Sequence, residues 1–334
     1  MKKRIAINGF GRIGRIAYRL LLGSSDYEVV AINSRGTAEE NAYLLKYDTV
    51  FRKFDENITV LDDGIMVDTT FTKVLQIDDP EKCPWRELNV DLVLECTGAF
   101  TKKEDAYKHI LAGAKHVIIS APGKDGMKTV VYGVNENILS RDDEIISSAS
   151  CTTNCLAPVL KIIEDNIGIE SGFMSTIHAY TNDQNTLDGS HKKGIKSRRG
   201  RTAASNIIPT STGAAKSIGV VIPTLSGKMD GVAYRVPVID GSMVDVTLTL
   251  NRATSVDEIN DLFRNNMNEV LDFTVDPIVS SDVIGRRAGS VVDGLSTNVL
   301  DVDGKQMVKI VAWYDNEMGY TAQMVRTAKY LMSL

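Results

Sequence analysis

The sequence lacks the features that mark several classes of protein. Only four cysteines occur in 334 residues, too few for a disulfide scaffold and without the paired spacing of a zinc site. No apolar run approaches the ~20 residues that span a bilayer, and no apolar leader with a cleavage site follows Met1. The 38 basic and 43 acidic residues give a net charge of −5 and no general attraction to nucleic acid or anionic membranes. We therefore expect a cytoplasmic protein with no metal site, no membrane partner and no nucleic acid as its primary partner.

The first residues predict a dinucleotide-binding unit. An apolar strand at residues 5–7 is followed by Gly9-x-Gly11-x-x-Gly14, by an apolar helix pattern, and by a second strand at residues 28–33. In such a unit the glycines allow a tight turn, close approach of the backbone to a pyrophosphate, and packing of the helix on the strand. A bare strand–helix turn can contain the same glycines. The strand–helix–strand context favours dinucleotide binding.

The end of the second strand favours NADP over NAD. An acidic residue about 20 positions past the glycines normally binds the ribose 2′-hydroxyl, but this chain has Ser34 and Arg35 there. A short hydroxyl and a guanidinium suit a 2′-phosphate. The alternative is that Arg35 is a solvated loop charge. Glu39 and Glu40 lie too far along, on the next predicted helix, to replace the missing carboxylate. Use of both cofactors stays open.

Strand and helix patterns continue to alternate as far as residue 150. Ligands of open α/β sheets bind beyond the carboxyl ends of the strands, which makes Thr97 and Ser120 candidate cofactor neighbours. The later part contains half-buried strand patterns, which predict an α+β domain with a mixed or antiparallel sheet and one helix-covered face. Because the length exceeds what one core usually supports, we predict two domains. The first is a Rossmann dinucleotide-binding domain of residues 1–150 plus 316–334, and the second is a catalytic domain of residues 151–315.

The most informative stretch is Ser148-Ala149-Ser150-Cys151-Thr152-Thr153-Asn154-Cys155. Its hydroxyl and amide residues precede an apolar run and predict a helix start, so Cys151 should lie near a helix N-terminus. Backbone N–H groups and the helix dipole stabilise a thiolate there, which lowers a thiol pKa from ~8.5 to roughly 3.5–7.5 and makes a nucleophile. The alternative is that Cys151 is a small buried residue that packs in the core. On this stretch alone the two interpretations have equal weight.

Candidates for a base and for anion sites follow in the later part. His178 lies on a predicted strand and could serve as the base for a cysteine nucleophile, although a lone strand histidine is usually structural. His191 resembles a surface residue. The dense basic run 191–201 lacks aromatics, which favours a small anion over nucleic acid and leaves a solvated loop open. Residues 209–216 resemble a hydroxyl-rich helix start and a second anion nest.

Taken in order, these motifs resemble the phosphorylating glyceraldehyde-3-phosphate dehydrogenase family over nearly the whole chain. The resemblance implies reversible oxidation of glyceraldehyde 3-phosphate, with inorganic phosphate, to 1,3-bisphosphoglycerate through a cysteine thioester. The physiological direction, glycolytic or gluconeogenic, stays open. The motif around Cys151 is the most specific. The others are residues 7–15, 45–48, 178–184, 212–216, 235–237 and 313–317.

The resemblance implies a role for each matching residue. Cys151 would attack the aldehyde, and His178 would take the hydroxyl proton as hydride leaves. The substrate phosphate would be bound by Thr181 and Arg235, and the attacking phosphate by Ser150, Thr152, Thr212, Gly213 and Arg199. The cofactor residues, from the glycine motif, the second strand and the family, would be Gly9, Gly11, Arg12, Ile13, Ser34, Arg35, Thr97, Ser120, Asn316 and Tyr320. The family is homotetrameric, with the loop 181–205 lining a neighbour's cofactor site.

Departures from the family pattern concern the cofactor. Members that use NAD have aspartate at Ser34 and Leu-Pro at residues 189–190, so this chain is more similar to NADP-using photosynthetic members. Asp78 replaces a family arginine that approaches the adenine. The nearest alternative is erythrose-4-phosphate dehydrogenase, which releases its product by hydrolysis, but Ser148 and Asn182 argue against it. An alternative of another class is an RNA-binding or surface-interaction protein, for which the chain offers no tail or aromatic platform.

Overall fold

The computed structural model describes residues 2–334. The chain forms two compact units, and each is described by itself. The first comprises the residues up to Tyr132, Glu136–Ala149 and Met324–Leu334, and the second comprises Gly133–Asn135 and Ser150–Gln323. The second boundary therefore lies inside helix α7 (Met318–Ser333) and not at residue 316. The reason is that the later turns of α7 contribute their apolar side chains to the core of the first unit.

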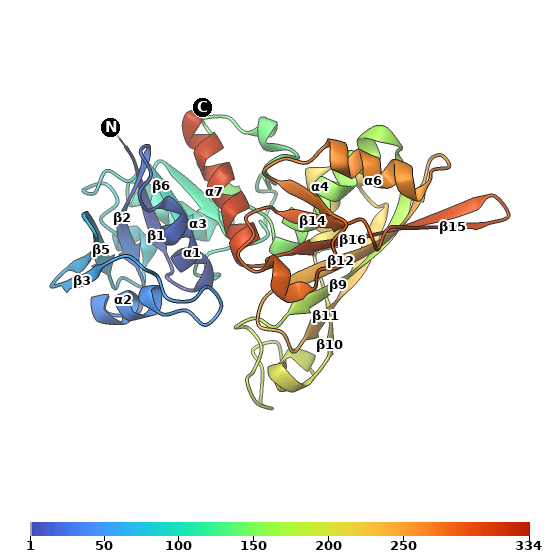
Figure 1. The fold of residues 1–334 in the computed structure, drawn as a ribbon. Helices are drawn as coiled ribbons and strands as arrows, with labels where there is room; N and C mark the ends of the chain where they lie inside the picture. Colours follow the sequence, from blue (N-terminus) through green and yellow to red (C-terminus); the bar gives the residue numbers. More distant parts are fainter. Residues whose placement is uncertain (1) are drawn as a thin grey trace. The chain divides into compact units, whose positions relative to one another are not determined.

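The first unit is built on an eight-stranded sheet with the order β3-β4-β5-β2-β1-β6-β7-β8 (Figure 1). Six strands run parallel: β1 (Lys3–Asn8), β2 (Tyr27–Asn33), β5 (Thr70–Leu75), β6 (Leu92–Glu95), β7 (His116–Ile119) and β8 (Ile145–Ser147). Strands β3 (Ile58–Leu61) and β4 (Gly64–Val67) extend one edge in antiparallel fashion. The strand order reverses between β1 and β6, and ligands of such sheets bind beyond the carboxyl ends at that reversal.

Helices cover both faces of this sheet. Ile5 and Ile7 belong to the core cluster that contains residues of α1 (Arg12–Leu21), α2 (Ala38–Lys46) and α7. Ala6 lies in the other cluster, with residues of α3 (Lys103–Leu111). Burial on both faces explains why the inner parts of the central parallel strands, residues 5–7, 29–32 and 92–94, are continuously apolar. The predicted Rossmann-type domain is confirmed.

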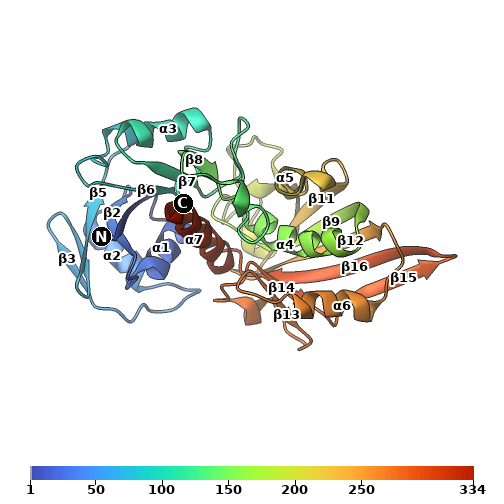
Figure 2. The same ribbon diagram turned by 90° about the horizontal axis from the view of Figure 1, so that it is seen from above.

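The second unit contains a mixed sheet with the order β10-β11-β9-β12-β16-β14-β13, and β15 pairs with β16. Its strands are β9 (Ile169–Ala179), β10 (Ile208–Ser211), β11 (Met229–Val236), β12 (Ser242–Leu250), β13 (Leu271–Thr274), β14 (Ser290–Asp293), β15 (Asn298–Val302) and β16 (Lys305–Tyr314). Helix α4 (Cys151–Asn166) packs on β9, β12, β14 and β16, while α5 (Ala214–Val221) contacts β11 and α6 (Val256–Asn265) contacts β13 (Figure 2). The predicted α+β architecture with a helix-covered face is confirmed.

Shorter features complete the description. The predicted helix start at residues 209–216 is only half right, because residues 208–211 pair with β11 as a strand and helix α5 begins at Ala214. Among residues 2–334, no helix is both long enough and apolar enough to cross a bilayer. The described residues contain six 3₁₀ turns, at Pro80–Lys82, Glu136–Ile138, Arg198–Gly200, Ala203–Ser205, Pro223–Leu225 and Ser280–Val283.

Candidate active site

The chain turns sharply from β8 into α4, and Cys151 is the first residue of the helix. Ala149 has a φ of 58°, a left-handed conformation that is uncommon for alanine. Ser150 is the N-cap, and its Oγ accepts the backbone N–H of Thr153 at 3.1 Å. The predicted helix start is therefore confirmed, and the thiol lies at the positive end of a 16-residue helix.

The structure brings the thiol of Cys151 and the imidazole of His178 together. Sγ of Cys151 lies 3.3 Å from Nε2 of His178, which is 3% exposed on β9. Nδ1 of His178 lies 2.7 Å from the backbone oxygen of Ala179. A carbonyl can only accept, so this contact favours a ring proton on Nδ1, whereas Nη1 of Arg235, which can only donate, lies 2.9 Å from the same nitrogen and favours the other tautomer. With the proton on Nδ1, the lone pair of Nε2 faces the thiol. In this tautomer the imidazole can take the thiol proton.

Arg235 lies beside the histidine because β9 and β11 are parallel neighbours that pair Arg235 with His178. Its Nη1 donates to the backbone oxygen of Ala179 at 2.9 Å and to Oγ1 of Thr181 at 3.1 Å. Within residues 2–334, Nε of Arg235 and Nε2 of Gln184 are buried donors that have no acceptor. Unpaired buried donors are costly. These two therefore suit an anionic ligand such as a phosphate.

Burial controls the protonation of the Cys151–His178 pair. It raises the pKa of the Cys151 thiol, against the positive charge of Arg235 and hydrogen bonds at the helix start. Burial and then the Arg235 charge lower the pKa of His178 to about 3. The lowered thiol pKa that the helix start predicted is therefore wrong, because desolvation outweighs the helix N-terminus. Near neutral pH the pair consists of a thiol and a neutral imidazole, so attack requires proton transfer to Nε2.

Replacing Arg235 with leucine should shift the titration of Cys151 to higher pH. Loss of the guanidinium removes a charge that favours the thiolate, so the pKa of the thiol rises, and the pKa of His178 rises because imidazolium is no longer disfavoured. The rate of iodoacetamide alkylation against pH reports this shift. The exposed Arg198 is a matched control, because Arg198→Leu removes the same charge from the basic loop. If the midpoint pH of alkylation shifts equally in both variants, or shifts to lower pH in Arg235→Leu, the result would contradict this electrostatic account.

The loop after β9 contains two further predicted site residues, and both contact Asp183. Thr181 donates from Oγ1 to the carboxylate at 2.5 Å, and Arg199 forms an ion pair with it. Arg199 also donates from Nε to Oγ1 of Thr210 at 3.3 Å. Asp183 thereby joins Thr181 to the Arg199 guanidinium, which the family resemblance assigns to the attacking phosphate.

The other predicted phosphate residues lie at helix starts. Thr152 faces inward, with its Oγ1 3.0 Å from the hydroxyl of Tyr314. Thr212 accepts the backbone N–H of Ala214 at 3.1 Å, and Gly213 is the N-cap of α5 with open space where a side chain would be. The hydroxyls of Ser150 and Thr152 thus serve as a cap and an internal contact in this structure. Backbone N–H groups at the two helix starts remain the natural anion donors.

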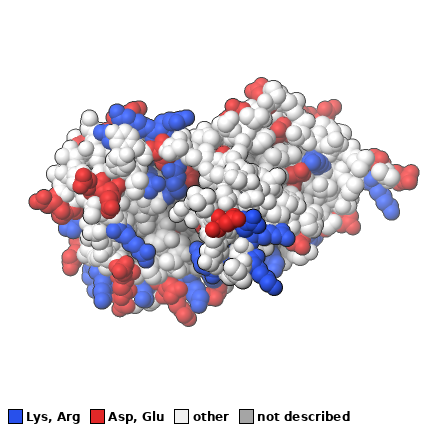
Figure 3. All heavy atoms as spheres, turned by 90° about the horizontal axis from the view of Figure 1, so that it is seen from below, with Lys and Arg blue, Asp and Glu red and all other residues white. Residues whose placement is uncertain are grey.

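The basic run lines a hollow of about 700 Å³ in the second unit, formed in part by Lys193, Lys196, Arg198 and Arg199. Two cations of the basic run form ion pairs, Arg199 with Asp183 and Arg201 with Asp188. On the face seen in Figure 3, acidic and basic side chains are interspersed and form no continuous basic surface. An extended nucleic-acid surface would need such a continuous area.

The glycine motif fits a pyrophosphate. Gly9 has a φ of 96°, and a Cβ there would lie 2.6 Å from the backbone nitrogen of Thr97. A Cβ on Gly14 would lie 2.1 Å from the oxygen of Gly9. Gly11 is the N-cap of α1 without a side-chain cap, and a Cβ there would meet nothing within 4 Å. The first turn of α1 therefore presents backbone N–H groups beside open space.

The remaining cofactor candidates divide between the two units. In the first, Arg12 is paired with Asp48, Thr97 donates to Glu95, and the backbone nitrogen of Ser120 donates to the oxygen of Glu95 at 3.0 Å. Ile13 packs partly buried against the core. In the second unit, Asn316 accepts from Ser242 at 2.6 Å, and Tyr320 is 5% exposed.

Ser34 and Arg35 lie directly after β2, as expected. Oγ of Ser34 accepts from Nδ2 of Asn41 at 2.8 Å and from the backbone nitrogen of Gly36 at 3.2 Å. The Arg35 side chain is 97% exposed and lies 3.9 Å from Asp78. The ion pair with Asp78 therefore holds the guanidinium only loosely, because a fully solvated ion pair contributes little stabilising free energy.

Sequence reasoning assigned no role to Tyr314, which fixes the start of α4 against β9. Oγ1 of Thr176 donates to the oxygen of Met243 at 3.1 Å, so the Tyr314 hydroxyl donates to Thr176 at 2.9 Å and accepts from Thr152. The Tyr314 ring also lies edge-on to His178, with centroids 5.9 Å apart. The only sequence feature that indicated a role for Tyr314 was its place in the motif 313–317. Its partners lie some 140 to 160 residues away in the chain, so no local pattern predicts these contacts.

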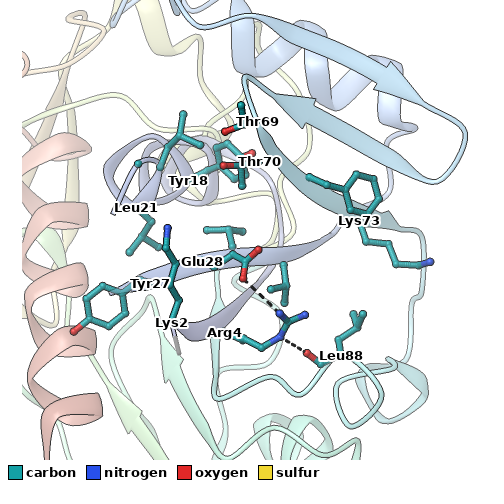
Figure 4. Close-up of a pocket in the computed structure, with 15 residues that line it drawn as sticks. Lys2, Arg4, Tyr18, Leu21, Tyr27, Glu28, Thr69, Thr70, Lys73 and Leu88 are labelled. Atoms are coloured by element: carbon teal, nitrogen blue, oxygen red, sulfur yellow. Dashed lines mark hydrogen bonds and ion pairs between the residues drawn. The ribbon is translucent and has the colours of Figure 1, made fainter. Parts of the chain in front are cut away.

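A cavity that the sequence did not predict lies at the amino ends of β1 and β2 (Figure 4). Its volume is about 730 Å³, and none of the predicted site residues lines it. Arg4, in its wall, donates to the oxygen of Leu88 at 2.7 Å and to Glu28 at 3.4 Å. Within the described part of the chain, no group of three or more His, Cys, Asp or Glu side chains is arranged for a metal ion.

The Rossmann unit and the Cys151–His178 pair define an oxidoreductase that uses a nicotinamide dinucleotide. Comparison with known proteins specifies the family. The model "Glyceraldehyde 3-phosphate dehydrogenase, NAD binding domain" matches residues 3–103, and the corresponding C-terminal domain model matches residues 150–316. The chain belongs to the glyceraldehyde-3-phosphate dehydrogenase family.

Curated relatives of that name cover the whole chain. The glyceraldehyde-3-phosphate dehydrogenase of Clostridium pasteurianum is 53% identical over 331 residues, 99% of each chain. That of Clostridium acetobutylicum is 52% identical over 331 residues, also 99% of each chain. The Streptococcus pyogenes enzyme is 50% identical over 335 residues, 100% of this chain and 99% of the relative.

Proposed function

We propose that the protein converts glyceraldehyde 3-phosphate and inorganic phosphate reversibly to 1,3-bisphosphoglycerate through a thioester on Cys151. The observation that supports this most is the 3.3 Å separation of the Cys151 thiol and Nε2 of His178 at the start of α4. A thiol that faces the Nε2 lone pair of a neutral imidazole is the arrangement that activates a cysteine nucleophile.

In the first step, Sγ of Cys151 forms a bond to the aldehyde carbon as its proton passes to Nε2 of His178. The carbonyl oxygen takes this proton from Nε2 and becomes the hydroxyl of a hemithioacetal, which leaves the imidazole neutral again. The backbone N–H of Cys151, together with the imidazole, stabilises the negative charge that develops on this oxygen. Arg235 and Thr181 hold the substrate phosphate, for which the buried Nε of Arg235 is a spare donor.

In the second step, His178 takes the hemithioacetal hydroxyl proton and the carbon becomes the carbonyl of a thioester. The bound dinucleotide supplies the acceptor for the hydride, with its two electrons, that leaves this carbon. A phosphate oxygen then bonds to the thioester carbonyl carbon and the bond to sulfur breaks. The sulfur takes the proton from His178, and the acyl phosphate leaves with the Cys151 thiol and the neutral imidazole regenerated. Backbone N–H groups at the starts of α4 and α5 and the Arg199 guanidinium hold the attacking phosphate.

Phosphate dependence tests this function against hydrolytic release. With glyceraldehyde 3-phosphate and the oxidised dinucleotide, steady turnover should require inorganic phosphate, and the product should be an acyl phosphate. Equal steady turnover without phosphate, yielding a free acid, would instead indicate hydrolysis, as in the erythrose-4-phosphate dehydrogenase alternative.

We infer that NADP is favoured over NAD, with use of both possible. The support is local: no carboxylate follows β2, Ser34 is held by Asn41, and the loosely paired Arg35 guanidinium is free to contact a 2′-phosphate. Asp78 lies beside that guanidinium in full solvent. The Glu40 carboxylate, which also lies near Gly36, accepts the backbone N–H of Thr37 at 2.8 Å.

Ser34→Asp should reverse the cofactor preference. A carboxylate repels a 2′-phosphate and accepts from the ribose hydroxyls of NAD. Hydrogen bonds to charged groups contribute about 1.5–3 kcal/mol, so kcat/KM for NADP relative to NAD should fall about ten- to a hundredfold. Ser34→Asn is the uncharged control of the same size and should change the ratio much less. A wild-type protein that clearly prefers NAD would contradict the proposed preference.

The loop of residues 181–205 is proposed to line a neighbour's cofactor site in a homotetramer. Leu187 and Ile195 in this loop are 74% and 86% exposed in the single chain. Large exposed apolar side chains on one loop support a surface that another copy covers.

A further inference from the structure

A chain of buried polar side chains crosses the first unit at the carboxyl ends of its central strands. Asn8 ends β1, Asn33 ends β2, and Glu95 ends β6. They are 2%, 5% and 1% exposed. Nδ2 of Asn8 donates to Oε2 of Glu95 at 2.5 Å, and Nδ2 of Asn33 donates to Oδ1 of Asn8 at 2.7 Å. Side chains therefore join three strand ends across the point where the strand order reverses.

His109 and Trp85 close this network on the α3 side. Nε1 of Trp85, which can only donate, lies 2.9 Å from Nδ1 of His109. Nδ1 is therefore an acceptor, and the ring proton lies on Nε2, 3.1 Å from Oε2 of Glu95. Both rings are fully buried. Trp85 thus selects the tautomer in which the histidine donates to the carboxylate.

The Glu95 carboxylate accepts from four donors. Oε2 faces Asn8 and His109, and Oε1 accepts the backbone N–H of Thr97 at 2.8 Å and the Thr97 hydroxyl. Four donors fill the acceptor sites of a carboxylate. An amide at this position would have to turn its NH₂ group toward other donors. The hydrogen-bond donors around position 95 therefore require a carboxylate, and glutamine, which has the same shape, does not satisfy them.

The groups that Glu95 holds lead directly into the predicted cofactor contacts. Asn8 precedes the turn at Gly9, and this turn packs so closely on the backbone of Cys96 and Thr97 that a Cβ would lie 2.6 Å from Thr97 N. Asn33 precedes Ser34. Its Nδ2 donates to the backbone oxygen of Ile77 at 2.8 Å, and its Oδ1 accepts the backbone N–H of Ile77 at 2.9 Å. Movement of the Glu95 carboxylate would therefore displace both the glycine turn and the Thr97 loop.

We propose that Glu95 is a positioning residue for the dinucleotide, and that His109, oriented by Trp85, and Asn8 fix its carboxylate so that the glycine turn and the Thr97 loop keep the spacing a pyrophosphate needs. The inference rests on the dinucleotide binding of the proposed function. Glu95 acts through Asn8 and Thr97, and it affects the cofactor and not the thiol chemistry of the second unit.

Glu95→Gln tests the proposal, with the dissociation constant of the dinucleotide measured by calorimetry or fluorescence. The NH₂ group of glutamine would face other hydrogen-bond donors, so the dissociation constant of the dinucleotide should rise about tenfold or more. The KM for the cofactor should rise with it. The KM for aldehyde and for phosphate and the alkylation rate of Cys151 should stay unchanged. A merely structural role would lower Tm without this selective loss of cofactor affinity.

A pair of His109 variants provides the rescue test. Glutamine at position 109 can donate to Glu95 and accept from Trp85, so His109→Gln should keep nearly the wild-type affinity, while His109→Leu should weaken binding as Glu95→Gln does. In ¹⁵N-labelled protein, the His109 ring should show its proton on Nε2, and Trp85→Phe should mix the tautomers. Unchanged affinity in both Glu95→Gln and His109→Leu, beside normal wild-type binding, would overturn the inference. Failure of the wild-type protein to bind either dinucleotide would instead overturn the proposed function.

Discussion

Replacing Cys151 with serine should abolish turnover while leaving dinucleotide binding intact. A serine hydroxyl is far more weakly acidic than a thiol, and the neutral imidazole of His178 cannot generate an alkoxide from it near neutral pH. Removal of a covalent nucleophile typically costs about 10⁴-fold or more in kcat. Steady-state kinetics and the dissociation constant of the dinucleotide, measured on the same preparation, separate the two effects.

Cys155 is the matched control for this substitution. It lies one helical turn beyond Cys151 and is fully buried, and its Sγ lies 3.9 Å from the backbone oxygens of Ala312 and Trp313. Those oxygens can accept from a serine hydroxyl, so Cys155→Ser should fold and keep its activity. Substantial turnover in Cys151→Ser, or an equal loss in both variants, would contradict the assignment of the nucleophile.

Replacing His178 with asparagine should reduce kcat by about 10²- to 10⁴-fold, the usual contribution of a general base. Because burial raises the thiol pKa, the protein depends on the imidazole to remove the thiol proton at the moment of attack. The loss should therefore be largest near neutral pH and smaller at alkaline pH, where hydroxide ionises part of the thiol. A pH profile of kcat/KM measures this trend.

His191 provides the comparison for His178. It lies in the basic loop and its Nε2 is 2.8 Å from the backbone oxygen of Asp183. His191→Asn should change kcat by less than about threefold, since loop substitutions away from the chemistry are usually tolerated. A large loss in His191→Asn, with normal activity in His178→Asn, would transfer the role of base to the loop.

Local patterns predicted the elements that carry the site. The hydroxyl cluster before an apolar run indicated the start of α4, and the residues around His178 indicated a strand. The structure confirms these placements because helix caps and strand burial depend on a few neighbouring residues. The glycine motif likewise predicted the first turn of the Rossmann unit.

Long-range contacts could not be predicted in the same way. No local pattern pairs Arg235 with His178 across two parallel strands, joins Thr152 to Tyr314, or brings His109 to Glu95. The thiol pKa was predicted in the wrong direction for the same reason: the helix start is visible in the sequence, but desolvation depends on everything that packs around it. Residues 209–211 resembled part of a helix start because their partner strand, β11, is distant in sequence.

Trapping the acyl enzyme tests the central claim most directly. The protein is mixed with glyceraldehyde 3-phosphate and the oxidised dinucleotide in the absence of phosphate, quenched in acid, digested, and analysed by peptide mass spectrometry. The account predicts one equivalent of a 3-phosphoglyceroyl thioester on the peptide containing Cys151, formed with one equivalent of reduced dinucleotide and discharged when phosphate is added. Reduced dinucleotide without an acyl group on that peptide, or an acyl group on another residue, would contradict it.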